Sequence, residues 1–399
     1  MPSLSMGTEQ LIDAASLIAF PAERPTLDRH AREVATAQAL CDEVLRDGPL
    51  LTHIWTSPYG RVGTILIPVV DMTLFEDRRR TVEAALKGIA LAVDAGARCI
   101  SFTGMIPAAT DYARDIADRV GPAAPDDDAG RSPSLTTGHA AVVAAFAFNV
   151  ESILTTAGRS YDDESVGFVG IGSIGQGILR LLDARGSPRK VFIVDITQNR
   201  DRLLRIREDL KGDVEVVAID KDGGLPPWLY DRCSLFLSAT STPLVIDVDQ
   251  LRPGTLLVDD SFPFGFDAER AASRIAAAAD IRITIAGGLH GVETLELADV
   301  FSHTERASEF GILLDRIARI INPWPKCMTG CVYSSLLTNY YDLPRTLGPV
   351  TYRDADTFYS KLKSEGFSGT PPHVFTFDTM HREAIQTMPE IRLERPAHA

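Results

Sequence analysis

Three glycines stand at the spacing that binding of a dinucleotide requires. Gly170, Gly172 and Gly175 follow a short apolar run and precede an apolar pattern of helical period. The first glycine permits a tight turn, the second lets the backbone approach a pyrophosphate, and the third lets helix and strand pack closely. The positive end of the helix would face the phosphates. We therefore expect this loop, with Ser173 and Ile174, to bind a cofactor.

An acidic residue closes the next predicted strand. Residues 190–195 are mostly apolar and end at Asp195, 20 residues after Gly175. This context makes a dinucleotide site more specific than the glycines alone, although a glycine turn in another βαβ unit has the same pattern. Asp195 could bind a ribose 2′-hydroxyl and favour NADH, whereas Arg200 and Arg202 could bind a 2′-phosphate and favour NADPH.

Further residues are expected on the nicotinamide side of the cofactor. Parallel strands present their carboxyl ends at one edge of a sheet, and ligands bind outside that edge. Two predicted strands, residues 235–239 and 281–286, run into polar or glycine-rich segments. The residues expected to line the cofactor there are Ala239, Thr240, Gly287 and Gly288.

A cysteine near the C-terminal part of the chain could act as a nucleophile. A helix beginning just past Pro325 would place Cys331 in its first two turns, where the helix dipole favours a thiolate. A thiolate attacks thioesters, and hydride from a nicotinamide could then release an aldehyde. The alternative is a small buried apolar residue, the common fate of a free cysteine. Cys327 would share a face of that helix as a resolving thiol, and no metal site is expected, because no ligand partner stands at suitable spacing.

Composition places the chain among ordinary globular proteins. It has 399 residues, a net charge of −14, 45% hydrophobic residues and 24% charged residues. The negative charge argues against a general nucleic-acid surface. Neither a signal peptide nor an apolar run of membrane-spanning length is expected. Five widely spread cysteines fit a reducing compartment, so the expected location is the cytoplasm.

The pattern of elements predicts an α/β protein with a Rossmann-type parallel sheet domain. It also predicts an N-terminal α/β domain and a C-terminal helical segment. Helices are expected over 26–46, 78–94 and 136–154, with a bent strand over 63–70 broken at Pro68, a strand over 96–102 and a loop over 121–134. Residues 305–341 have a helical pattern, and no structure is assigned after residue 344. The expected boundaries are 1–134 for the acyl-binding domain, 135–164 for a connecting helix, 165–300 for the Rossmann domain and 301–399 for the helical segment and tail.

Several short segments, taken in order, resemble the long-chain acyl-acyl-carrier-protein reductases, which reduce acyl thioesters to fatty aldehydes. The likeness is distant and spans about residues 95–342. The matching segments are 102–106 (Phe-Thr-Gly-Met-Ile), 135–138 (Leu-Thr-Thr-Gly), the glycines 170, 175 and 177, 257–259 (Leu-Val-Asp), 286–288 (Ala-Gly-Gly) and 328–331 (Met-Thr-Gly-Cys). The resemblance implies that Cys331 carries the acyl group, that NADPH is the cofactor, and that the partner is acyl carrier protein or acyl-coenzyme A.

One departure from the family concerns the proton donor. The family's histidine falls on Ala141, and His139 lies two positions earlier, on a different face of the helix. Either His139 takes over a polar role, or the acid–base function is lost or moved. The alternative for His139 is a residue at the start of a helix that hydrogen-bonds locally.

The residues and the resemblance together predict an NAD(P)H-dependent reductase that converts an acyl thioester, a small-molecule acyl substrate included, to an aldehyde. Cys331 would attack an acyl thioester, Thr136, Thr137 or nearby N–H groups would hold the oxyanion, and His139 or His290 would supply a proton. Two alternatives stay open. One is a non-covalent NAD(P)-dependent dehydrogenase of an alcohol, imine or amino acid, and the other is an inactive nucleotide-binding homologue. The oligomeric state is open too, a homo-oligomer included.

Overall fold

The computed structural model describes residues 10–21, 30–121, 133–221, 223–261, 263–291, 296–299, 326–374 and 386–387, with four single positions between 311 and 318. The chain forms two compact units, and each is assembled from separate stretches of sequence. Unit 1 comprises residues 1–138, 292–321 and 331–348, and unit 2 comprises 139–291, 322–330 and 349–399. This division differs from the expected one, because residues 135–164 and 301–399 are each shared between the two units.

Unit 1 is built on a six-stranded sheet of order β13-β2-β3-β1-β4-β5. The four strands from β3 to β5 run parallel, whereas β2 and β13 are antiparallel additions. The strands are β1 (Ala14–Phe20), β2 (Leu50–Ser57), β3 (Gly60–Val70), β4 (Cys99–Phe102), β5 (Ser134–Thr136) and β13 (Glu296–Asp299). The predicted break at Pro68 is a bulge, because the pairing of β1 with β3 skips from Ile67 to Val70. Proline lacks the N–H that this ladder needs.

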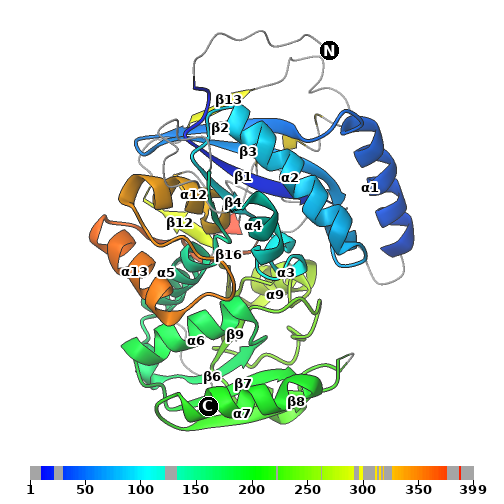
Figure 1. Ribbon diagram of the computed structural model, residues 1–399. Helices are drawn as coiled ribbons and strands as arrows, with labels where there is room; N and C mark the ends of the chain where they lie inside the picture. The colour runs from blue at the N-terminus through cyan, green and yellow to red at the C-terminus, as the bar shows by residue number, and fades with distance from the viewer. Residues whose placement is uncertain are drawn as a thin grey trace. The chain divides into compact units, whose positions relative to one another are not determined.

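Helix α2 (Arg78–Asp94) packs on the sheet of unit 1 (Figure 1), and its buried side chains belong to the core of that unit. Its buried residues recur at helical spacing, and the Asp77 side chain accepts a hydrogen bond from the N–H of Arg80 at its start. The other helices described in this unit include α1 (His30–Val44), α3 (Ile106–Ala109) and α4 (Arg114–Val120). The predicted loop over 121–134 lies mostly outside the described residues.

Unit 2 contains a second six-stranded sheet, of order β8-β7-β6-β9-β10-β11, and all its strands are parallel. Numbered along the unit, this is the order 3-2-1-4-5-6 of the Rossmann fold, as the sequence predicted. The strands are β6 (Ser165–Val169), β7 (Lys190–Ile196), β8 (Val214–Ile219), β9 (Leu235–Ser238), β10 (Leu256–Asp259) and β11 (Arg282–Ile285). The helices between them include α6 (Ser173–Arg185), α7 (Arg200–Glu208), α8 (Pro227–Arg232) and α9 (Ala268–Ala278).

Helix α5 (His139–Ala157) is the core helix of unit 2. Within the described residues it is long and apolar enough to cross a membrane, which corrects the expectation that no such run exists. However, most of it is buried against α6, α13 and strands of this unit. A helix that is apolar all round is typical of a protein interior as well as of a membrane span, and here the burial accounts for its composition.

The C-terminal part of the chain differs from the prediction in two places. Residues Cys327–Thr329 form a strand, β14, in a small antiparallel sheet with β12 (Gly288–His290) and β15 (Ser368–Gly369). Helix α12 (Gly330–Tyr341) therefore begins five residues after Pro325. The tail, to which no structure was assigned, contains α13 (Tyr352–Ser364), whose buried side chains pack against α5 and α6.

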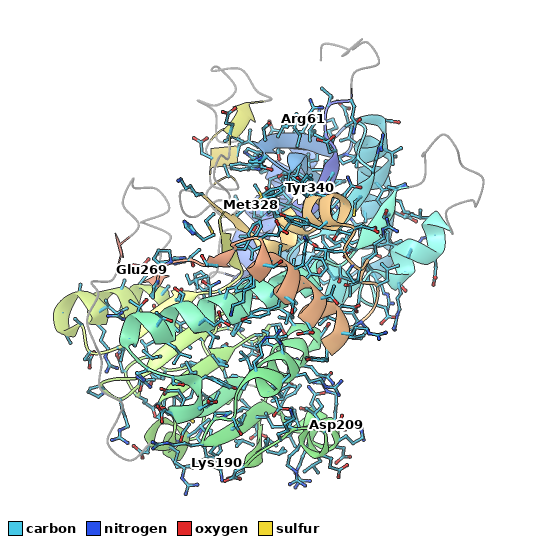
Figure 2. All side chains as sticks on the ribbon, turned by 90° about the vertical axis from the view of Figure 1, so that its left-hand side faces the viewer. Arg61, Lys190, Asp209, Glu269, Met328 and Tyr340 are labelled. Atoms are coloured by element: carbon cyan, nitrogen blue, oxygen red, sulfur yellow. The ribbon has the colours of Figure 1, made fainter. Side chains whose placement is uncertain are left out.

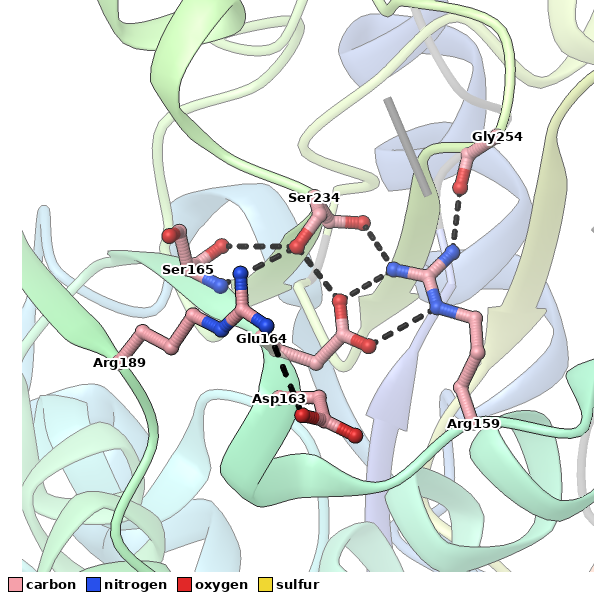
Figure 3. Close-up of polar contacts among 7 residues, drawn as sticks. All are labelled: Arg159, Asp163, Glu164, Ser165, Arg189, Ser234 and Gly254. Atoms are coloured by element: carbon pink, nitrogen blue, oxygen red, sulfur yellow. Dashed lines mark hydrogen bonds and ion pairs between the residues drawn. The ribbon is translucent and has the colours of Figure 1, made fainter. Parts of the chain in front are cut away.

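A buried ion pair ties together the amino ends of three strands of the Rossmann sheet (Figure 3). Arg159 and Glu164 are both buried, and the Arg159 Nε donates to Glu164 at 2.8 Å. The same guanidinium donates to the carbonyl oxygens of Ser234 and Gly254, and the Ser234 hydroxyl donates to Glu164. Breaking a buried pair by removing one partner costs about 3–5 kcal/mol. This network stabilises the end of the sheet opposite the glycine loop.

Candidate functional site

The three glycines of the loop after β6 are required for three different reasons. Gly170 has a φ of +85°, and a Cβ atom there would lie 2.6 Å from the Ala239 carbonyl oxygen. A Cβ atom on Gly175 would lie 2.0 Å from the carbonyl oxygen of Gly170, so the turn and the helix could not pack. At Gly172, by contrast, no atom of the described residues other than its immediate chain neighbours lies within 4 Å of the corresponding position. The space beside Gly172 is where a pyrophosphate would approach the backbone.

Helix α6 begins directly after this loop, with Gly172 at its N-cap. The Ser173 hydroxyl accepts from the N–H of Val350 at 2.9 Å and lies 3.1 Å from Nδ1 of His139. Ser173 therefore anchors the first turn of α6, and its hydroxyl is already engaged within the protein. Ile174 is half-buried. The phosphate-binding groups of the loop would accordingly be its backbone N–H groups at the helix N-terminus.

Asp195, at the end of β7, is saturated with hydrogen bonds from its own unit. Its Oδ2 accepts from the N–H of Ile171 at 3.0 Å and from Arg202 at 3.1 Å. Its Oδ1 accepts from the N–H of Ile196 at 2.8 Å and from the Asn199 amide at 3.0 Å. A carboxylate has about four lone-pair positions, so Asp195 has none left for a ribose hydroxyl. It holds the glycine loop in place instead.

The charge around Asp195 favours an additional phosphate group. Arg202 forms an ion pair with Asp195 and neutralises its charge. Arg200 is exposed at the start of α7, so it adds a positive charge beside the pair. A guanidinium binds phosphate through several N–H donors. Of the two cofactors left open by the sequence, NADPH fits this arrangement better than NADH.

The carboxyl edge of the sheet brings several of the sequence-predicted residues together. The Ala239 N–H donates to the Val169 carbonyl, which joins the end of β9 to the end of β6. The Thr240 N–H donates to the Ser261 hydroxyl at 3.0 Å. Both residues are half-buried at the edge where a nicotinamide lies in this fold.

The two glycines after β11 have different surroundings. Gly287 has a φ of +91° and its carbonyl accepts from the N–H of Gly330, the residue before Cys331, at 2.7 Å. Gly288 is buried, and its carbonyl accepts from the Asn149 amide at 2.9 Å. A Cβ atom on Gly288 would meet Cys327 Sγ at 3.0 Å, so this glycine is a packing position. Gly287 is buried as well, and a Cβ atom there would lie 2.7 Å from Oδ1 of Asp260.

A pair of adjacent carboxyl groups at the end of β10 was not singled out from the sequence. Asp259 is buried and accepts from the N–H groups of Ser261 at 3.2 Å and Gly265 at 3.1 Å. Burial raises the pKa of Asp259 to about 6, against the effect of these hydrogen bonds. Burial and the Asp259 charge raise the pKa of Asp260 to about 8. The signal in the sequence is a double aspartate at the end of an apolar strand, at the edge where ligands bind.

Cys331 is the second residue of α12, and it differs from the other four cysteines. It is partly exposed, whereas Cys41, Cys99, Cys233 and Cys327 are buried. Burial raises the pKa of Cys41, Cys99 and Cys327 to about 12 and also raises that of Cys233. A reactive cysteine needs exposure and an environment that favours thiolate, and a helix N-terminus provides the latter. Cys331 is therefore the best-placed nucleophile of the five. The sequence predicted that Cys327 shares a helix face with Cys331, but Cys327 lies on strand β14 instead.

Within unit 1, Cys331 lies against the segment that precedes α5. A Cβ atom on Gly138 would lie 3.2 Å from the carbonyl oxygen and 3.3 Å from the Cα of Cys331. Within unit 1, Gly138 and Cys331, which come from two different segments that carry the family resemblance, are thus in contact. The N–H of Thr137 donates to Thr346 at 2.8 Å, and that of Gly138 donates to the Thr136 hydroxyl at 3.4 Å. Both amides are therefore engaged, which favours the first turn of α12 as the source of oxyanion donors.

The face of α12 that begins with Cys331 is unexpectedly polar. Ser334, Ser335 and Thr338 follow at the spacing of one helix face. All three hydroxyl groups are buried and have no hydrogen-bond partner among the described residues, and the same holds for Thr346. Sequence reasoning missed this stripe, although its period was visible.

His139 is placed for a structural role more than for proton donation. It is buried, and its burial lowers its pKa to about 4. At neutral pH it is therefore an uncharged ring that lies beside the hydroxyl of Ser173. A general acid works best with a pKa near the working pH. His139 is the first residue of α5, as the sequence-based alternative expected, but its Nδ1 pairs with Ser173 on α6 and not with a group of its own segment.

Comparison with known proteins gives distant likenesses only. No protein-family model matches the chain. The aminotransferase PigE of Serratia sp. (strain ATCC 39006) is 27% identical over 211 residues, which are 52% of this chain and 23% of that protein. The chain thus spans about a quarter of that relative's length.

Solved structures with some likeness include dehydrogenases and reductases. The Δ1-pyrroline-2-carboxylate reductase of Thermococcus litoralis, solved with NADH and L-proline, is 15% identical with a TM-score of 0.26, over 34% of this chain and 41% of that one. The glucose dehydrogenase of Haloferax mediterranei, solved with NADP, zinc and gluconolactone, is 16% identical with a TM-score of 0.27, over 37% and 42%. The pyruvate reductase of Chlamydomonas reinhardtii is 13% identical with a TM-score of 0.31, over 88% and 98%. Likeness at this level carries no argument about activity.

Proposed function

We propose that this chain is an NAD(P)H-dependent oxidoreductase. The support is the Rossmann strand order of unit 2 together with the open position beside Gly172. Gly170 and Gly175 shape the turn, and the N-terminus of α6 would face the pyrophosphate. The saturated Asp195 and the exposed Arg200 support NADPH as the preferred cofactor.

We further propose that the reaction is the reduction of an acyl thioester to an aldehyde through Cys331. The observation that carries this proposal is the position of Cys331, the one partly exposed cysteine of five, at the N-terminus of α12. In the first step the Cys331 thiolate attacks the acyl carbon, an acyl–sulfur bond forms, and the carrier leaves as a thiolate that takes a proton from solvent. A cofactor bound at the glycine loop would supply hydride to the acyl carbon, and the Cys331 thiolate would be the leaving group that releases the aldehyde.

The substrate class follows from that chemistry. The carrier must supply a thiol leaving group, so acyl carrier protein and acyl-coenzyme A are the candidate partners. The stripe of Ser334, Ser335 and Thr338 on the Cys331 face of α12 is buried, so these hydroxyl groups lie within the protein and not on a surface that a carrier would contact.

The direct test is incubation of the protein with palmitoyl-coenzyme A and NADPH. The expected products are palmitaldehyde, NADP⁺ and free coenzyme A thiol in equal amounts. Cys331→Ala should form none of them, whereas Cys327→Ser should keep most of the wild-type rate. Aldehyde formation by Cys331→Ala at the wild-type rate would contradict the covalent mechanism.

A non-covalent dehydrogenase is the second candidate, and one observation favours it. Asp260 places a carboxyl group with a raised pKa at the nicotinamide edge, where it could protonate a carbonyl reduced directly by hydride. This mechanism needs no cysteine. It predicts that Cys331→Ala oxidises NADPH with a ketone or imine substrate as fast as the wild type does.

A further inference from the structure

The two aspartates at the end of β10 have opposite environments. Successive side chains of a strand point to opposite faces. Asp259 is directed inward, where Ser261 and Gly265 donate backbone N–H groups to it. No hydrogen bond to the carboxyl group of Asp260 is formed within the described part of the chain, and this residue is only half-buried. Asp259 is thus a structural carboxylate, whereas Asp260 presents an unused carboxyl group.

The position of Asp260 is fixed by its neighbours. Its N–H donates to the Ser238 carbonyl at 2.8 Å, which holds it at the carboxyl edge of the sheet. A Cβ atom on Gly287 would lie 2.7 Å from Oδ1 of Asp260. The φ of +91° at Gly287 also disfavours any other residue there. Gly287 therefore leaves the room that the Asp260 carboxyl group occupies.

This edge is where the reacting end of a dinucleotide lies in a Rossmann fold. Ala239 and Thr240, at the end of the neighbouring strand β9, belong to the same edge. Within unit 2, Gly287 is also hydrogen-bonded to Gly330, which directly precedes Cys331 in the sequence.

The protonation state of Asp260 suits a donor. Burial and the adjacent charge of Asp259 raise its pKa to about 8, and Asp259 is the charged group that acts on it. At neutral pH Asp260 is then mostly a neutral carboxylic acid with an O–H to donate. In many enzymes two neighbouring carboxyl groups have different pKa values because their environments differ. The group with the higher pKa then acts as the acid, and the other stays ionised.

We propose that Asp260 donates a proton to the oxygen of the carbonyl group that receives hydride. The inference rests on the proposed function. When hydride adds to the acyl carbon of the Cys331 thioester, the oxygen takes the Asp260 proton and a hemithioacetal forms. When the carbon–sulfur bond breaks, the Asp260 carboxylate takes the proton back, the aldehyde forms and Cys331 is a thiolate again. Asp260 is reprotonated at the end of the cycle, so the net reaction consumes one hydride and the thioester and yields the aldehyde and the Cys331 thiolate.

The test separates the two half-reactions. Protein acylated with palmitoyl-coenzyme A is mixed with NADPH, and cofactor oxidation is followed in a single turnover. Asp260→Asn should acylate Cys331 normally but transfer hydride at least ~100-fold more slowly, the usual contribution of general acid catalysis. The wild-type rate should fall as pH rises past about 8, and this dependence should be absent in Asp260→Asn. Asp249→Asn, which changes an exposed carboxylate paired with Arg270, is the matched control and should behave as the wild type does.

A second variant tests the geometry without removing the carboxyl group. Gly287→Ala should displace the Asp260 carboxyl and slow hydride transfer. Gly366→Ala has a similar φ of +85° with open space around its Cβ position, so it controls for backbone strain alone. Unchanged hydride transfer and an unchanged pH profile in Asp260→Asn would overturn the proposal.

Failure of the proposed function would be visible separately. If the wild type never acquires an acyl group, the thioester mechanism fails before Asp260 is tested. Asp260 is then tested by ¹³C NMR of protein labelled at the aspartate carboxyl carbons. A resonance that titrates near pH 8 and is missing in Asp260→Asn supports the donor, and one that titrates near the ordinary aspartate value of about 4 excludes it.

Discussion

Gly138 and Cys331 are in contact within unit 1, although 193 positions of sequence separate them. The backbone of Cys331 lies so close to Gly138 that a Cβ atom there would come within 3.2 Å of the Cys331 carbonyl oxygen. Gly138 also has a φ of +76°. The glycine therefore sets how the segment before α5 meets the first turn of α12.

Replacement of Gly138 should disturb Cys331 more than strain alone would. Gly138→Ala combines an unfavourable φ with a tight contact to the Cys331 backbone, so we expect a loss of stability above the ~1–2 kcal/mol of left-handed strain. Gly104→Ala is the matched control, because its φ is +56° and its Cβ position is open. Alkylation of Cys331 by iodoacetamide should change in Gly138→Ala and not in Gly104→Ala. Equal effects of the two variants would show that the contact has no influence on the thiol.

Variants of the glycine loop distinguish effects on cofactor binding from effects on protein stability. Gly172→Val should leave the melting temperature nearly unchanged, because no protein atom lies near its Cβ position, yet weaken NADPH binding by at least tenfold, ~1.4 kcal/mol. Gly224→Val, at another open position of the same unit, should change neither property. Gly175→Ala should destabilise unit 2, since its Cβ would overlap the Gly170 carbonyl. Fluorescence titration and thermal melting test these three variants, and unchanged NADPH affinity in Gly172→Val would exclude the loop as the pyrophosphate site.

Cofactor preference depends on the two arginines in different ways. Arg200→Ala should weaken NADPH binding and spare NADH, because Arg200 is exposed and would bind only the 2′-phosphate. Arg202→Ala should also weaken NADPH, but it should improve NADH, because it frees one acceptor position of Asp195 for a ribose hydroxyl. Dissociation constants measured at one salt concentration test both expectations. A wild-type preference for NADH would contradict our choice of cofactor.

Asp260 should make stability depend on pH in a predictable direction. Its folded-state pKa of about 8 lies above the ordinary aspartate value of 3.8, so the folded protein holds a proton that the unfolded chain has released. The stability gained from this proton is complete below about pH 4 and is lost as pH rises through about 8. The free energy of unfolding of the wild type relative to Asp260→Asn should therefore fall between about pH 4 and pH 8. Urea unfolding at several pH values measures it, and a constant difference would mean that Asp260 is not protonated in the folded state.

The sequence predicted the parallel sheet of unit 2 closely because its strands are short apolar runs with clear ends. Helix α2 was predicted over the residues that it occupies, since its apolar period and its start after Asp77 are both local signals. Helix α13 also carried such signals but was missed. Thr351 caps it by accepting from the N–H of Asp354, and its buried residues recur at helical spacing.

Features that depend on tertiary structure could not be predicted in the same way. Strand β14 has three residues and exists because it pairs with β12, so the local pattern around Cys327 suggested a helix. The four donors that saturate Asp195 come from the glycine loop, from its own strand, from Asn199 in the turn before α7 and from Arg202 in α7. The division into two units could not be read along the chain either, because each unit collects separate segments.

The two ends of helix α12 are more exposed than the apolar composition of this helix suggests. Figure 2 labels Tyr340, at the end of α12, which is 54% exposed and packs edge-on against Tyr59 and Tyr341. The same helix thus begins with a partly exposed thiol and ends with an exposed aromatic residue. Neither position follows from the mean apolar character of the helix.

The central claim is that Cys331 forms an acyl-enzyme, and intact mass spectrometry tests it most directly. The protein is incubated with palmitoyl-coenzyme A in the absence of NADPH, and the adduct is located by peptide mapping. We expect one palmitoyl group on Cys331, no adduct in Cys331→Ser, an unchanged adduct in Cys327→Ser, and loss of the adduct with release of palmitaldehyde when NADPH is added. Absence of any adduct in the wild type, or an adduct on another cysteine that NADPH discharges equally well, would contradict the account.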